Sequence, residues 1–104
     1  MTYKIIELTQ GNINNNHLYL SSIIDFFPPS SVGGGNETEV ASQLLEIHCG
    51  IESPVFTDIA GDKKIFRKRA WVKEFFQSHA LSIGNKVVIE KTDAYRYHIY
   101  PARV

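Results

Sequence analysis

The sequence is short of cysteine, of long apolar runs and of net charge. Its one cysteine, Cys49, cannot form a disulfide within the chain, which is compatible with the reducing cytoplasm. No apolar run approaches the roughly 18 residues that cross a bilayer, and the first residues, MTYKIIELT, lack a signal-peptide pattern. We therefore expect a cytoplasmic protein without a membrane partner.

The balance of charge excludes one class of nucleic-acid binder. Eleven basic and eleven acidic residues give a formal net charge of zero, so a purely electrostatic, histone-like mode of binding is not expected. The length of 104 residues, with 43% hydrophobic and 21% charged residues, is typical of one soluble globular domain. We expect a single domain over residues 1–104.

The basic residues are unevenly distributed along this neutral chain. Six of the eleven lie between Lys63 and Lys73, with no acidic residue among them. A local basic segment beside an aromatic helix can attract a polyanion to one face of the molecule, and duplex DNA is approached in this way. The alternative is an ordinary solvated strand and helix start, and from charge alone the two interpretations stand equal.

Hydrophobic periodicity predicts short strands with two short helices. The clearest helix is expected at 70–79, where Trp71, Val72, Phe75 and Phe76 recur at helical spacing and should form part of the core. A second helix is expected at 23–27, ended by Pro28. Turn-forming residues occupy 10–16, 33–36, 60–62 and 84–85. Strands are expected at 3–8, 17–20, 45–51, 54–59, 65–68, 86–91 and 95–100, and 40–45 suits either helix or strand. The sum is a mainly β, mostly antiparallel barrel.

Two stretches resemble the B-three DNA-binding domain, a pseudobarrel of plant transcription factors. Leu8-Thr9 through His17-Leu18-Tyr19-Leu20 to Phe26-Phe27-Pro28 resembles the first hairpin of that family and the short helix after it. Phe66-Arg67 through Trp71, Phe75-Phe76, Leu81 and Gly84-Asn85-Lys86-Val87-Val88 resembles its second half. Asn85 stands where the family usually has Asp, and the Trp-Asn-Ser stretch of plant members is absent.

The resemblance is closer to the bacterial group, which supplies recognition domains to restriction endonucleases of the EcoRII and BfiI kind. It implies a mainly β, seven-stranded open pseudobarrel with two short helices. It also implies sequence-specific binding of double-stranded DNA in a bacterial cytoplasm, within a restriction–modification system. Cleavage would then come from a separate nuclease domain or subunit.

In that family two arms enter the major groove, and position by position they correspond here to 10–19 and 57–69. Asn can pair with adenine, Arg with guanine, and Asp can accept from cytosine. The resemblance and this chemistry together give residues expected at bases, at phosphates and at the DNA backbone beside the strand edge. The base candidates are Asn12, Asn14, Asn15, Asn16, His17, Thr57, Asp58, Asp62 and Arg67; the phosphate candidates are Lys63, Lys64, Lys68 and Arg69; the backbone candidates are Tyr19 and Ser21. Gln10, at the start of the first arm, is a further DNA-binding candidate without a more specific role. The alternative for the Asn-rich segment is plain turn chemistry.

The sequence offers little for catalysis. Asp62-Lys63-Lys64, with Asp58 upstream, has the form of half a nuclease motif, but it follows a glycine in an expected turn. The histidines are widely separated, and the run of glycines from Gly33 lacks the residues of a phosphate-binding loop. We predict no enzymatic activity, no metal and no cofactor. The alternative function is a protein-interaction module, an adaptor or inhibitor, that docks segment 63–73 on an acidic partner; a small DNA-cleaving enzyme ranks third.

Overall fold

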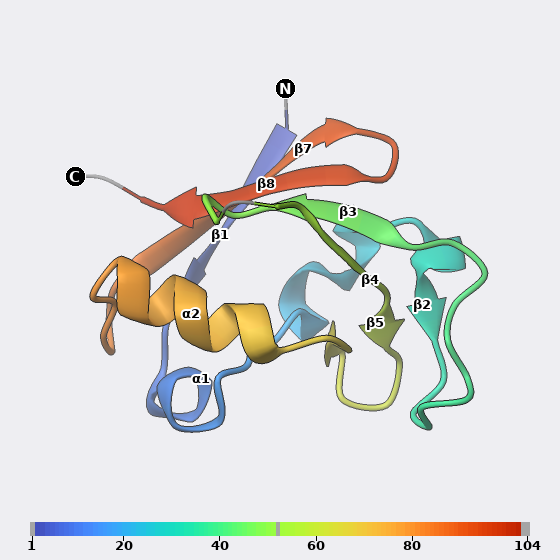
Figure 1. The fold of residues 1–104 in the computed structure, drawn as a ribbon, viewed down its shortest axis with the longest axis horizontal. Helices are drawn as coiled ribbons and strands as arrows, with labels where there is room; N and C mark the ends of the chain where they lie inside the picture. Colours follow the sequence, from blue (N-terminus) through green and yellow to red (C-terminus); the bar gives the residue numbers. More distant parts are fainter. Residues whose placement is uncertain (1, 52, 103–104) are drawn as a thin grey trace.

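The computed structural model describes residues 2–51 and 53–102, which form a mainly β fold with short helices (Figure 1). Within these residues the strands make two separate sheets that do not close into a barrel. The expected mainly β, open fold is therefore confirmed. No helix in the described ranges is long and apolar enough to cross a membrane.

The larger sheet has five strands in the order β1-β7-β8-β3-β4. Its long members are β1 (Thr2–Glu7), β7 (Lys86–Asp93) and β8 (Arg96–Pro101), and its short ones are β3 (Leu45–His48) and β4 (Val55–Thr57). All neighbours are antiparallel except β3 and β8. The strands expected at 86–91 and 95–100 are confirmed as β7 and β8, which pair with each other as an antiparallel hairpin.

The smaller sheet is built from β2 (Val32–Gly33), β5 (Ile59–Ala60) and β6 (Ile65–Phe66). β2 runs parallel to β5, and β5 pairs antiparallel with β6. The strand expected at 54–59 is therefore two strands that belong to different sheets, β4 and β5. The buried Asp58 stands between them, at the point where the chain leaves one sheet for the other.

Within residues 2–51 and 53–102, four short helices connect and cover the sheets. α2 (Ala70–Ser78) has the expected position and buries its predicted aromatic face, so that prediction is confirmed. η1 (Ser21–Phe26), expected as a helix, is of the 3-10 type, and η2 (Pro29–Ser31) is a further 3-10 turn. α1 (Gln10–Asn15) replaces the turn that was expected at 10–16. In Figure 1, α1 lies below α2, on the side away from the larger sheet.

Two further expectations at the strand level were wrong. Residues 17–20 contribute only an isolated bridge between Tyr19 and Ile65, because the backbone of Leu20 turns directly into η1. Residues 40–44 form neither helix nor strand, and β3 begins only at Leu45.

Aromatic rings link the sheets through the core. Tyr97 on β8 is fully buried, with Phe27 4.9 Å away between ring centroids, and Phe27 in turn packs on Phe66. Phe66 contacts Trp71 of α2 at 5.5 Å between centroids. The Tyr97 hydroxyl donates to the Phe26 carbonyl at 2.8 Å, and burial raises the pKa of Tyr97 to about 12. This series of contacting rings connects the end of η1 and α2 to Tyr97 of the larger sheet.

Tyr97→Phe should lower the free energy of unfolding by about 1–2 kcal/mol, because it removes a buried hydrogen bond and leaves the Phe26 carbonyl without its donor. Urea denaturation measures the change. Tyr100→Phe is the matched control on the same strand, since the Tyr100 side chain is half-buried on the other face. Equal effects of the two substitutions would contradict this account of the core.

Candidate nucleic-acid interface

α1 begins at a capping box built by Thr9 and Asn12. The Asn12 Oδ1 accepts from the Thr9 backbone N–H at 2.7 Å and from its hydroxyl at 2.9 Å, and the Thr9 Oγ1 accepts from the Asn12 N–H at 3.3 Å. Asn12 Nδ2 donates to the His17 carbonyl at 2.9 Å. The Asn12 side chain is buried and its groups are used within the protein, so its expected contact with a base is withdrawn.

The other amide side chains of α1 remain at the surface. Gln10, Asn14 and Asn15 are exposed, and Gln10 Nε2 donates to Asn14 Oδ1 at 2.6 Å. Asn16, in the left-handed conformation at φ 52°, ends the helix and donates its backbone N–H to the Asn12 carbonyl. These side chains keep the donors and acceptors that an adenine edge requires.

His17, Tyr19 and Arg69 join this helix to the basic segment. Asn15 Nδ2 donates to the Tyr19 hydroxyl at 3.3 Å, and the Tyr19 ring meets the His17 ring edge to face at 5.5 Å between centroids. Arg69 Nη1 lies 2.7 Å from His17 Nε2. The backbone makes the same connection, since the Leu20 N–H donates to the Lys64 carbonyl at 2.8 Å. The two predicted arms are therefore side by side.

The contact with Arg69 fixes the protonation of His17. A guanidinium can only donate, so His17 Nε2 must accept and the ring proton must lie on Nδ1. Among the described residues Nδ1 is buried and has no hydrogen-bond partner. Burial of the ring, followed by the charges of Arg69 and Lys63, lowers the pKa of His17. In the free protein the imidazole is therefore held neutral.

The Arg67 side chain is 15% exposed, and its hydrogen-bond donors are used within the protein. Its Nε donates to Asp58 Oδ1 at 2.7 Å and its Nη2 to Asp58 Oδ2 at 3.0 Å. The remaining donors reach the carbonyls of Gly34 at 2.7 Å, Asn36 at 2.9 Å and Glu39 at 3.3 Å. The pair of Arg67 and Asp58 thus ties loop 34–39 to the junction of the two sheets.

Asp58 and Thr57 are also withdrawn from the set of base contacts. The Asp58 side chain is 2% exposed, and its Oδ2 accepts from the Ala41 N–H at 2.8 Å. Burial acts to raise the pKa of Asp58, but the hydrogen bonds from Arg67 and Ala41 outweigh it and lower that pKa. The buried Thr57 hydroxyl donates to the Asp58 carbonyl and accepts from the Lys68 N–H. Neither side chain can reach a base without unfolding the junction.

The turn at 61–64 carries the exposed charges of the second arm. Asp62 Oδ1 accepts from the Lys63 N–H at 2.8 Å, and Lys64 adopts the left-handed conformation at φ 55° and donates to the Gly61 carbonyl at 3.3 Å. The Asp62 and Lys63 side chains are exposed. Lys68 and Arg69 are exposed beyond β6, and so is Ser21 at the start of η1. No ion pair within the described residues involves Lys63, Lys64, Lys68 or Arg69.

Loop 34–39 was missed as part of this surface. A shallow hollow of about 310 Å³ lies between this loop and the turn, lined by Gly35, Glu37, Asp62, Lys63 and Arg69 among others. A Cβ on Gly33, directly before the loop, would clash with the Glu39 carbonyl oxygen and come within 2.7 Å of the Ala41 nitrogen, so this close approach of the backbone requires glycine. The run of three glycines was the available signal. In Figure 1, α1, the turn after β5 and the loop after β2 all project on the side away from the larger sheet.

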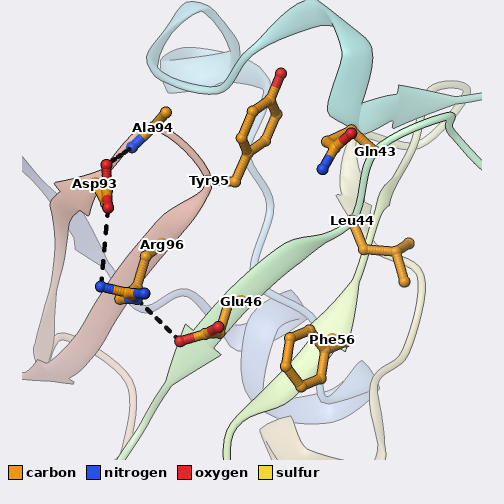
Figure 2. A pocket seen from close by; sticks show the side chains of 8 residues that line it. All are labelled: Gln43, Leu44, Glu46, Phe56, Asp93, Ala94, Tyr95 and Arg96. Carbon is orange, nitrogen blue, oxygen red and sulfur yellow. Dashed lines mark hydrogen bonds and ion pairs between the residues drawn. The ribbon is translucent and has the colours of Figure 1, made fainter.

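A second hollow lies elsewhere, between β3, β4 and the β7–β8 hairpin (Figure 2). Arg96 bridges the strands there, with Nε 2.9 Å from Glu46 Oε2 and Nη1 3.9 Å from Asp93 Oδ2. Phe56 and Leu44 expose 47% and 41% of their surface beside this bridge. The charges of this hollow are paired with one another, unlike those of the basic segment.

The fold is similar to that of one solved domain. No family model matches the chain, and no curated protein matches it. The N-terminal domain of Helicobacter pylori LlaJI.R1 superposes with a TM-score of 0.59 and 7% sequence identity, over 100% of this chain and 89% of that one. At this level of identity the likeness concerns the fold.

Arg67→Ala should destabilise the protein by about 3–5 kcal/mol, because it leaves the buried Asp58 carboxylate without its cation. Urea denaturation measures the loss, and hydrogen exchange should show faster exchange of the Ala41 amide. Arg96→Ala is the matched control: its side chain is 51% exposed, so its pair with Glu46 should contribute less than about 1 kcal/mol. A similar small loss for both variants would show that Arg67 does not hold the junction.

Proposed function

We propose that this protein binds double-stranded DNA sequence-specifically, with α1 and segment 61–69 entering the major groove together. The observation that carries the proposal is the contact of Arg69 with His17, which joins the exposed amides of α1 to the unpaired cations of the basic segment. Had the two segments been on opposite sides, no common groove could hold them. Adjacent amide and cationic side chains supply the base contacts and phosphate contacts that sequence-specific binding needs.

We propose fewer DNA contacts than the sequence alone suggested, because Asn12, Thr57, Asp58 and Arg67 bond within the protein. The proposed base contacts are Gln10, Asn14, Asn15, Asn16, His17 and Asp62, and the proposed phosphate contacts are Lys63, Lys64, Lys68 and Arg69, with Tyr19 and Ser21 beside the DNA backbone. Four cations at phosphates would give a log–log salt dependence of the association constant near about −3.6. Specificity then depends on few side chains, which suits a small footprint.

The fold supports the same assignment. The N-terminal domain of H. pylori LlaJI.R1 superposes on 100% of this chain with 89% of its own length, so the whole fold, and not one motif of it, is shared. We infer a DNA-recognition domain of the B-three-like pseudobarrel kind, acting in a bacterial restriction–modification system. Cleavage would be carried out by another domain or chain.

The hydrogen bonds of Asp58 argue against the alternative of a metal-dependent nuclease. A metal-dependent nuclease needs two carboxylates free to bind the metal, beside a lysine. Asp58, the expected partner of Asp62, has both oxygens in hydrogen bonds to Arg67 and Ala41. Within the described residues no group of three His, Cys, Asp or Glu side chains could hold a metal. We therefore propose a binding domain without catalysis.

A protein-interaction module is the second candidate function. The hollow of Figure 2 favours it, because Phe56 and Leu44 are large apolar side chains at the surface beside a charged bridge. That hollow does not involve the basic segment 63–73. Binding to random duplex DNA at low salt distinguishes the two functions, because only the first predicts it.

Selection from a randomised duplex library should yield a preferred site, and two substitutions should then differ in effect. Asn15→Ala should weaken binding to the selected site by about 1–3 kcal/mol and leave binding to random DNA unchanged, since it removes a base contact. Lys63→Ala should weaken both kinds of DNA alike and reduce the salt dependence by about 0.9, since it removes a phosphate contact. Fluorescence anisotropy with labelled duplexes measures both.

Lys91→Ala is the control for these variants. Lys91 is a half-buried lysine on β7, opposite Thr2 at the start of β1, whereas α1 follows the other end of β1, so its removal should change neither quantity. An enriched site that is bound equally by wild type and all three variants would exclude the proposed interface.

Binding should also strengthen as the pH falls from about 8 to 5.5. A phosphate that engages Arg69 frees His17 Nε2 and adds a negative charge beside it, so the His17 pKa should be higher in the complex than in the free protein. Protons are then taken up on binding, and affinity rises at low pH. His17→Gln should flatten the profile, whereas His79→Gln, at an exposed histidine beyond α2, should preserve it. A profile that stays steep without His17 would contradict this linkage.

A further inference from the structure

β1 differs from the other outer strand of the larger sheet. β4 has only three residues and follows Pro54, and short strands and prolines are common protections of a sheet edge. β1 has six residues, with no proline and no irregularity in its pairing with β7. Its free edge is therefore long and regular, as in strands that pair with another chain.

The hydrogen bonds at its end show which groups face the free edge. The Leu8 N–H donates to the Asn85 carbonyl at 2.8 Å, and in an antiparallel ladder alternate residues bond to the same neighbour. The Ala102 N–H donates to the Lys86 carbonyl at 2.9 Å, so the even residues of β7 bond to β8. The odd residues of β7 therefore bond to β1, and their partners in β1 are the even residues. The even residues of β1 therefore bond to β7. The odd residues, Tyr3, Ile5 and Glu7, present their N–H and C=O groups at the free edge.

These three residues have nothing else to bond with. None of their backbone groups takes part in a hydrogen bond outside the sheet within the described ranges. Their side chains share the outer face of the sheet, where Tyr3 is 58% exposed and Ile5 is 49% exposed. Unpaired backbone groups and exposed apolar side chains thus belong to the same residues.

We propose that β1 pairs antiparallel with β1 of a second copy, with Ile5 opposite Ile5 and Tyr3 opposite Glu7. Symmetric pairing by free backbone groups requires odd residues to lie opposite odd residues. In this register Tyr3, Ile5 and Glu7 of both strands are paired. Each of the three residue pairs makes two backbone hydrogen bonds, which gives about six in total. The Tyr3 hydroxyl can also donate to the facing Glu7 carboxylate.

Charge and length disfavour the neighbouring registers. A shift that places Tyr3 opposite Ile5 would also bring Lys4 opposite Lys4, and like charges directly opposite each other are destabilising. A shift the other way places Ile5 opposite Glu7 and leaves Tyr3 without a partner. The edge is therefore complementary to itself in one register, which favours a second copy over an unrelated strand. This inference does not depend on the proposed DNA binding.

Sedimentation velocity across a range of concentrations tests the pairing. Wild type should shift from monomer to dimer as concentration rises. Ile5→Lys places like charges at the symmetry axis and should stay monomeric. Phe56→Lys is the matched control, since Phe56 is 47% exposed on the other outer strand, and it should dimerise as wild type does. The proposal would be overturned if wild type stayed monomeric at every concentration, or if the Ile5→Lys variant dimerised as strongly as wild type. A monomeric wild type would indicate instead that the free edge of β1 pairs with a strand of another protein.

Cysteine substitution tests the register. Ile5→Cys should form a disulfide-linked dimer under mild oxidation, because directly paired residues lie at about 5.5 Å between Cα atoms, within disulfide range. Tyr3→Cys should form far less, because Tyr3 faces Glu7 instead of itself. Wild type is the control, since Cys49 is buried. Equal crosslinking at both positions would overturn the register.

Discussion

The ion pair of Asp58 with Arg67 is the interaction on which the rest of this structure depends. Asp58 stands where the chain passes from the five-stranded sheet to the three-stranded sheet, and its buried carboxylate must be compensated there. Arg67 supplies the charge and also binds three carbonyls of loop 34–39. Because burying an ion pair gains little stability over an apolar pair, we interpret its role as positional: it sets the angle between the sheets and places the loop.

Buried polar side chains order the backbone segments that carry the exposed polar side chains of the two arms. Asn12 closes the capping box of α1 and also holds the His17 carbonyl, so both ends of the six-residue helix are fixed. Arg67 does the same for the loop beside Asp62. Side chains such as Asn14 and Lys63 then project from a backbone that is already ordered, and binding has less entropy to lose. The buried members of the two arms therefore contribute to recognition by positioning the exposed ones.

The sequence predicted the helices and strands whose formation depends on residues close together in the chain. Helical spacing located α2 and its buried aromatic face, a short apolar run located β7, and alternation located β8. α1 was taken for a turn although Thr9 and Asn12 have capping-box spacing, because a run of asparagines is so typical of loops. The division of 54–59 into two strands depends on Asp58 and Arg67, whose pairing joins separate strands and has no local signal. That pairing also explains why Arg67, expected at a base, is internal.

The zero net charge of the chain conceals a difference between two of its surface regions. In the hollow between β3, β4 and the β7–β8 hairpin, Arg96 pairs with Glu46 and Asp93 (Figure 2). Around the turn after β5, Lys63, Lys68 and Arg69 have no such partner among the described residues, and Arg69 instead donates to a neutral imidazole. A cation that donates to a neutral acceptor keeps its full charge available to an anion. Cations without an ion-pair partner thus lie on the edge that α1 shares, and a polyanion would meet them there.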